Sequence, residues 1–168
     1  MIEQHYLDDS LVQLRKLKAQ ADKAMTQVDE SQFFALLDPD ANSIALIVKH
    51  VAGNMRSRWT DFLTSDGEKP DRHRDTEFEI GTADTREAIL ARWEAGWSLV
   101  FTAIASIQPD DLGKTVTIRN EPHTVVQAIH RQVSHYASHV GQIVLLAKHF
   151  AGPGWKTLSI PKKKTGSV

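Results

Sequence analysis

The chain of 168 residues contains no cysteine. Disulfide bonds, cysteine-based zinc sites and catalysis by a thiolate of the protein itself are therefore excluded. The absence is compatible with a reducing compartment. The N-terminal segment is polar overall and lacks the apolar core of a signal peptide, so we expect a cytoplasmic protein.

Long apolar runs are missing too, since no stretch of the sequence is long enough to cross a bilayer. Lysine and arginine number 20, aspartate and glutamate 21, and the formal net charge is −1. Without an excess of positive charge, neither nucleic acid nor an acidic membrane is an expected partner. The 41% of apolar residues is enough for one domain with a substantial core.

Apolar residues recur at helical rather than alternating spacing in four long segments. We predict helices over about residues 2–28, 43–63, 84–107 and 125–150, with a short turn or helix at 30–37. Asp84 and Glu87 form a predicted capping box for the third long helix, and Thr124 and Gln127 one for the fourth. Gly152 and the proline after it should end the last helix. Residues 1–150 are thus predicted to form an all-α domain, a four-helix bundle.

The segments between the helices carry weaker signals. Residues 65–83 form a long polar crossover between the second and third long helices, and loops of this length are usually functional or mobile. Residues 115–118 alternate in polarity and are followed by a turn-like sequence at 120–122, which indicates a small β-hairpin before the fourth long helix. The tail, residues 151–168, carries Trp155 and is predicted to pack on the bundle or on a partner. Its lysines, Lys162–Lys164, are expected to be a solvated terminus.

Three histidines are the candidate metal ligands. His135 and His139 are four residues apart and project from the same side of a helix, so both imidazoles can bind one ion. His50 on the second long helix would complete a three-histidine site with open coordination positions, as catalytic metals have. Eight histidines give about 0.4 such pairs by chance, so a hydrogen-bonded or exposed histidine pair is the competing interpretation.

Two segments resemble the DinB/YfiT-like superfamily, a group of metal-binding four-helix bundles. One is His50-Val51-Ala52-Gly53-Asn54, and the other contains His135, His139, Gly141 and Gln142 in the pattern H-x3-H-x-G-Q. Residues 42–45 and 155–161 are similar to one branch of the superfamily, small bacterial proteins of undefined function. The resemblance covers nearly the whole chain.

The resemblance implies a mononuclear divalent ion (Zn, Ni, Mn or Fe) on His50, His135 and His139, and a homodimer. It also implies a small-molecule substrate and either S-transfer with a low-molecular-weight thiol or hydrolysis. Any thiolate must come from the substrate, and imidazole ligands do not select one metal. The alternative is a metal-binding or dimeric interaction module without catalysis.

Three further side chains are candidates for the pocket around the ion. Asn54 and Gln142 lie one turn or less beyond a histidine and are candidates to orient its ring, although amides bonded to water or backbone are as well supported. Arg58, with Arg56, is a candidate to hold an anionic substrate, but a solvated pair is the favoured interpretation. Glu94 is expected to be exposed rather than a catalytic base.

Overall fold

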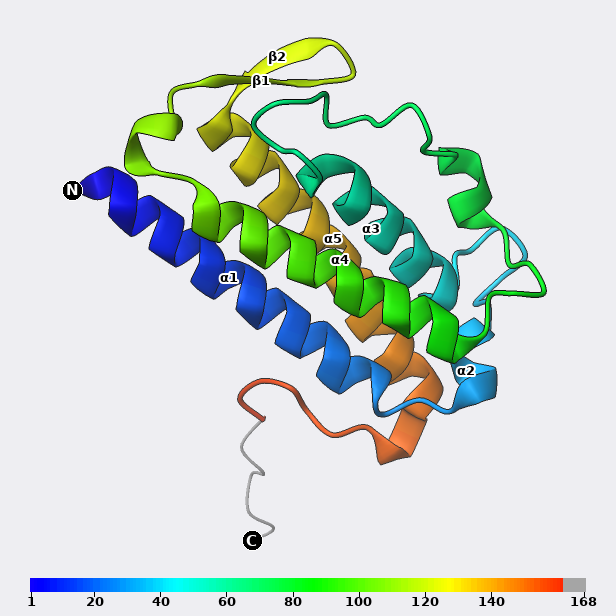
Figure 1. Ribbon diagram of the computed structural model, residues 1–168. Coiled ribbons are helices and arrows are strands. Elements are labelled where there is room, and N and C mark those ends of the chain that lie inside the picture. The colour runs from blue at the N-terminus through cyan, green and yellow to red at the C-terminus, as the bar shows by residue number, and fades with distance from the viewer. Residues whose placement is uncertain (162–168) are drawn as a thin grey trace, which may run out of the picture.

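The computed structural model describes residues 1–161, and Lys162–Lys164 lie outside the described residues. Within residues 1–161 the chain is mostly helical, with one small sheet, as the sequence predicts (Figure 1). The five α-helices are α1 (Ile2–Met25), α2 (Glu30–Phe34), α3 (Ile44–Trp59), α4 (Arg86–Ser106) and α5 (Val125–Ala151). The strands are β1 (Thr115–Ile118) and β2 (Glu121–Thr124), and the short 3-10 helices are η1 (Arg74–Phe78), η2 (Pro109–Asp111) and η3 (Gly152–Gly154).

Four long helices lie side by side and enclose the core (Figure 1). α1 contacts α4 and α5, and α3 contacts the same two helices. Trp93, Trp97 and Tyr136 are among the largest side chains of the core and are fully buried. Gly96 lets α4 approach α3 closely, because a Cβ there would lie 3.1 Å from side-chain atoms of Met55. None of the helices among residues 1–161 is long and apolar enough to cross a membrane.

The start of α4 corrects the prediction that Asp84 is its cap. Thr85 is the N-cap instead, and its hydroxyl accepts a hydrogen bond from the backbone N–H of Ala88. The carboxylate of Asp84 bonds with Lys49 at 2.8 Å and with Arg92 at 2.7 Å. Both of its oxygens are therefore engaged in tertiary ion pairs. The capping box of Thr124 and Gln127 is present at the start of α5, as predicted.

The long helix α3 ends at Trp59, four residues before the predicted end. Thr60 is extended and Asp61 has a positive φ of 49°, a conformation that non-glycine residues adopt rarely. The chain then folds back along α3, where the backbone oxygen of Gly67 accepts a hydrogen bond from the Ser57 hydroxyl at 2.8 Å. The polar crossover therefore begins on the surface of α3 itself.

The crossover is joined to the β-hairpin. The hairpin turn is Arg119–Asn120, with φ of 57° and 61°, as a two-residue type I′ turn requires. It lies one residue before the predicted turn, since Glu121 and Pro122 belong to β2. The carboxylate of Asp66 accepts hydrogen bonds from the backbone N–H groups of Arg119 (2.9 Å) and Asn120 (2.8 Å). These bonds place the hairpin beside the crossover and α3.

The described part of the tail packs on the helices. Trp155 and Leu158 are partly buried against the core. The side-chain amide of Gln27, just after the end of α1, bonds with both the backbone N–H (2.6 Å) and the backbone oxygen (3.1 Å) of Lys156. The tail thereby covers the end of α1.

Candidate metal centre

The fold brings His50 of α3 together with His135 and His139 of α5. One ring nitrogen from each lies within 4.8 Å of the others. The Nε2 atoms of His135 and His139 are 3.1 Å apart. Two nitrogens bound to one ion at about 2.0–2.1 Å are about 2.8–3.4 Å apart, from octahedral to tetrahedral geometry, so this spacing suits a single ion. These three residues could hold a metal.

Gln142 orients one of the three rings. Its carbonyl oxygen Oε1 lies 2.8 Å from Nδ1 of His139. A carbonyl oxygen only accepts hydrogen bonds, so Nδ1 carries the proton and Nε2 keeps a free lone pair directed at His135. Gln142 is therefore placed to orient the His139 ring, the role for which its position in the sequence made it a candidate.

His50 is oriented by Glu77, a residue that the sequence analysis missed. Its Nδ1 lies 2.8 Å from the Glu77 carboxylate, and both side chains are buried. Arg72 donates to the two oxygens of the same carboxylate, at 2.8 Å each. Burial opposes ionisation of Glu77, but the bonds from His50 and Arg72 outweigh it and hold the pKa of the carboxyl below its ordinary value. Carboxylates that accept the second ring N–H of a histidine are typical of metal sites.

Glu77 comes from η1, in the middle of the crossover. It is 27 residues from His50 in sequence, and no periodicity links the two. The only signal that pointed to it was the length and charge of the crossover. Gly53 makes the contact possible, because any Cβ at that position would collide with the Glu77 carboxylate. Only glycine at position 53, three residues after His50, leaves room for the Glu77 carboxylate.

Asn54, a candidate to orient a histidine or to line the pocket, lines the cavity described below and bonds with side chains of α5 other than the histidines. Its Oδ1 accepts hydrogen bonds from Gln132 Nε2 at 2.7 Å and from the Tyr136 hydroxyl at 3.3 Å. The Tyr136 hydroxyl in turn accepts from the indole N–H of Trp59 at 2.9 Å. Burial raises the pKa of Tyr136 to about 12, so the hydroxyl stays neutral. This buried network fixes the wall of the site between α3 and α5.

The two histidines of α5 are held in the neutral form. Burial, with the nearby His139 and His50, lowers the pKa of His135 to about 3. Burial also lowers the pKa of His139, although the hydrogen bond that its Nδ1–H donates to Gln142 acts in the opposite direction. Neutral imidazole is the form that binds metal ions. Among residues 1–161, no hydrogen-bond partner reaches the buried Nδ1 of His135.

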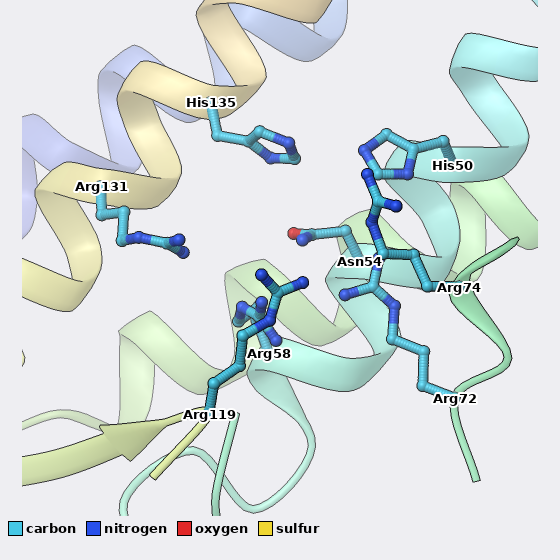
Figure 2. A pocket seen from close by; sticks show the side chains of 8 residues that line it. All are labelled: His50, Asn54, Arg58, Arg72, Arg74, Arg119, Arg131 and His135. Carbon is cyan, nitrogen blue, oxygen red and sulfur yellow. The ribbon is translucent and has the colours of Figure 1, made fainter. Parts of the chain in front are cut away.

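A cavity of about 320 Å³ opens beside the histidines (Figure 2). It is lined by His50, His135, Asn54 and five arginines: Arg58, Arg72, Arg74, Arg119 and Arg131. The solvated-pair interpretation is wrong for Arg58, which is only 3% exposed. It holds for Arg56, which is exposed and pairs with Asp71. Glu94 is exposed and pairs with Lys18 on α1, as expected.

Comparison with protein families adds one finding. Residues 1–164 match the model of a family described as "Protein of unknown function (DUF1572)". The chain belongs to the DUF1572 family. A comparison with curated proteins gives no match. The DUF1572 match includes the histidines, the crossover and the hairpin, and the family description assigns no activity.

Proposed function

We propose that this DUF1572 protein is a metal-dependent enzyme whose single divalent ion is bound by His50, His135 and His139. One observation carries the proposal: three imidazoles from two helices meet within 4.8 Å, and two of them line a cavity. Three protein ligands leave coordination positions open, as catalytic sites do. A zinc, nickel, manganese or iron ion bound there would lower the pKa of a thiol or water molecule beside it.

The side chains around the histidines would prepare the site for that chemistry. Glu77 and Gln142 accept the Nδ1–H of His50 and His139, which leaves the opposite nitrogens free to bind the ion. The network of Asn54, Gln132 and Tyr136 closes the wall toward the core. The open side is the arginine-lined cavity, where a substrate would enter.

S-transfer is the chemistry we favour, with a low-molecular-weight thiol as co-substrate. The chain has no cysteine, so the thiol must be brought by a small molecule. The packing of α1, α3, α4 and α5 and the order of the histidines support membership in the DinB/YfiT-like superfamily of four-helix bundles, where thiol-dependent transferases occur. Hydrolysis, with water as the nucleophile, needs the same ion and the same open position.

Metal analysis tests the ligand set. We expect one equivalent of metal in the purified protein and in His130→Ala, an exposed position on the same helix. The variant His135→Ala/His139→Ala should lose it. Equal metal content in the double variant and the wild type would contradict the proposed ligand set.

Measurements of turnover distinguish the proposed enzyme from an interaction module that has no catalytic activity. The metal-loaded protein should accelerate the reaction of an electrophile with at least one of several low-molecular-weight thiols, or hydrolyse a substrate, and the metal-free protein should not. A metal-loaded protein that turns over neither kind of substrate would favour the interaction module.

The homodimer also remains a proposal. Leu36, Leu37 and Leu145 are exposed at 46–63% of their surface, and Leu37 and Leu145 line one surface hollow. Contiguous exposed apolar surface marks sites of protein association, so we propose this hollow as part of the dimer interface. Sedimentation velocity would distinguish a dimer from a monomer.

A further inference from the structure

Five arginines from four parts of the chain share the cavity beside the histidines. Arg58 comes from α3, Arg72 and Arg74 from the crossover, Arg119 from the hairpin and Arg131 from α5. Figure 2 shows their guanidinium groups turned toward the space that His135 and Asn54 also face. The crossover and the hairpin thus each contribute to this cluster.

The acidic groups near the cluster do not balance its charge. Glu68 pairs with Arg58 at 3.0 Å, Arg72 at 3.2 Å and Arg119 at 2.9 Å, so one carboxylate serves three guanidinium groups. Glu77 pairs with Arg72 and with His50. With Asp75, which pairs with Arg74, three carboxylates pair with the five guanidinium groups, and an excess of two positive charges remains around one cavity.

Arg131 and Arg74 are the least neutralised of the five. Arg131 forms no ion pair within residues 1–161, and Arg74 reaches only Asp75, at 3.7 Å. The Asp75 side chain is 99% exposed, so water screens that pair. Arg131 is also four residues before His135, on the same side of α5. An anion bound to Arg131 would therefore lie next to the metal ligands.

Arg58 points independently to a bound anion in the cavity. It is 3% exposed, and its Nε has no hydrogen-bond partner among the described residues. Its other nitrogens donate to the Gly67 backbone oxygen and to Glu68. A buried cation with an unmet donor is unfavourable unless an anion or a polar group completes its bonds.

We infer that the cavity binds an oxyanion group of the substrate, a phosphate or a carboxylate, beside the three histidines. The position of that group relative to the reaction rests on the proposed function, whereas anion binding itself does not. Guanidinium groups are planar forks that match the paired oxygens of carboxylates and phosphates. A cavity of about 320 Å³ accommodates a small molecule rather than a polymer. The substrate, or its thiol co-substrate, is thus a small molecule with a phosphate or carboxylate group.

Calorimetric titration of the full chain with inorganic phosphate and with malonate tests this inference. Both titrations use metal-free protein in a zwitterionic buffer at fixed low salt. We expect at least one of the two anions to bind the wild type, and which one binds identifies the phosphate or carboxylate class. Arg131→Gln should weaken that binding about tenfold, because one bidentate contact is lost. Arg56→Gln, an exposed change on α3 outside the cavity, should leave it unchanged.

Two results would overturn the inference: no binding of either anion to the wild type, or equal affinities for the wild type and Arg131→Gln. Circular dichroism of both variants checks that they are folded, which the exposure of Arg131 and Arg56 favours. The His135→Ala/His139→Ala variant separates the two proposals. Metal loss there with anion binding retained supports both. A wild type that binds the anion but no metal refutes only the proposed function, and one that binds metal but neither anion refutes only this inference.

Discussion

The two sides of the candidate metal centre are built in different ways. On α5, His139 is oriented by Gln142, three residues further along the same helix, and the Gln142 side chain is exposed. On α3, His50 is oriented by Glu77, which arrives from the crossover and is buried. The α5 side therefore needs only a helix, whereas the α3 side needs the crossover to fold correctly over Gly53.

This difference predicts unequal consequences of mutation. A partner within the same helix is present whenever the helix forms, and water can replace an exposed partner. A buried carboxylate from a distant segment has no substitute. Its loss removes the acceptor of His50 and one of the two carboxylates that pair with Arg72. Changes on the α3 side should cost more metal affinity and more stability than changes on the α5 side.

Glu77→Ala should have the largest effect. We expect metal affinity to fall about 10–100-fold, as it does when the acceptor of a ligating histidine is removed. Unfolding free energy should fall by about 3–5 kcal/mol, the range for breaking a buried ion pair by removing one partner. Competitive metal titration and urea unfolding of the metal-free protein measure the two effects. A variant as stable as the wild type would show that the buried carboxylate does not hold the crossover on α3.

Gly53→Ala tests the same side without removing a charge. The added Cβ would collide with the Glu77 carboxylate and displace it from His50, so metal affinity should fall about tenfold. Gly141→Ala is the matched control on α5, where an added Cβ meets no atom within 4 Å. That change should keep metal affinity and raise stability by about 0.5–1 kcal/mol through helix propensity. Equal losses of metal affinity in both variants would contradict the steric role of Gly53.

Gln142→Ala should have a smaller effect on metal affinity, about tenfold or less, because water can accept the His139 N–H at this exposed position. Stability should change by about 0.5 kcal/mol or less, as is usual for surface substitutions. The same titration and unfolding experiments apply. If Gln142→Ala costs more affinity than Glu77→Ala, the two sides of the site have been ranked in the wrong order.

Asp66→Asn should produce the smallest effect, and only in a defined pH range. Burial opposes its ionisation, but hydrogen bonds from the backbone N–H groups of Glu68, Asn120 and Arg119 lower the pKa of Asp66 from 3.8 to about 2. A lowered pKa means that ionised Asp66 stabilises the fold above about pH 4 and loses that contribution as the pH falls toward 2. The difference in unfolding free energy between wild type and Asp66→Asn should therefore be present at pH 5 and shrink below pH 4. A difference in unfolding free energy that does not vary with pH would contradict the lowered pKa of Asp66.

Much of the helical layout follows from local patterns. Apolar spacing predicted the long helices, and the Thr124 capping box marked the start of α5 correctly. The predictions that were wrong concern positions whose structure depends on tertiary contacts. Asp84 is engaged by Lys49 and Arg92 rather than by the helix end, and α3 stops at Trp59 because the crossover turns back there. Arg58 was expected in solvent, and that same turn buries it.

By itself, the sequence determined what depends on neighbours within one helix. The absence of cysteine excluded a protein thiolate, and the spacing of His135, His139 and Gln142 placed them on one side of α5 because the helical repeat is local. Only the tertiary structure decided that His50 would face that pair, that Glu77 would hold its ring, and that five arginines would surround one cavity. Those contacts depend on the path of a long crossover and a hairpin, where no periodicity relates a residue to its distant partner.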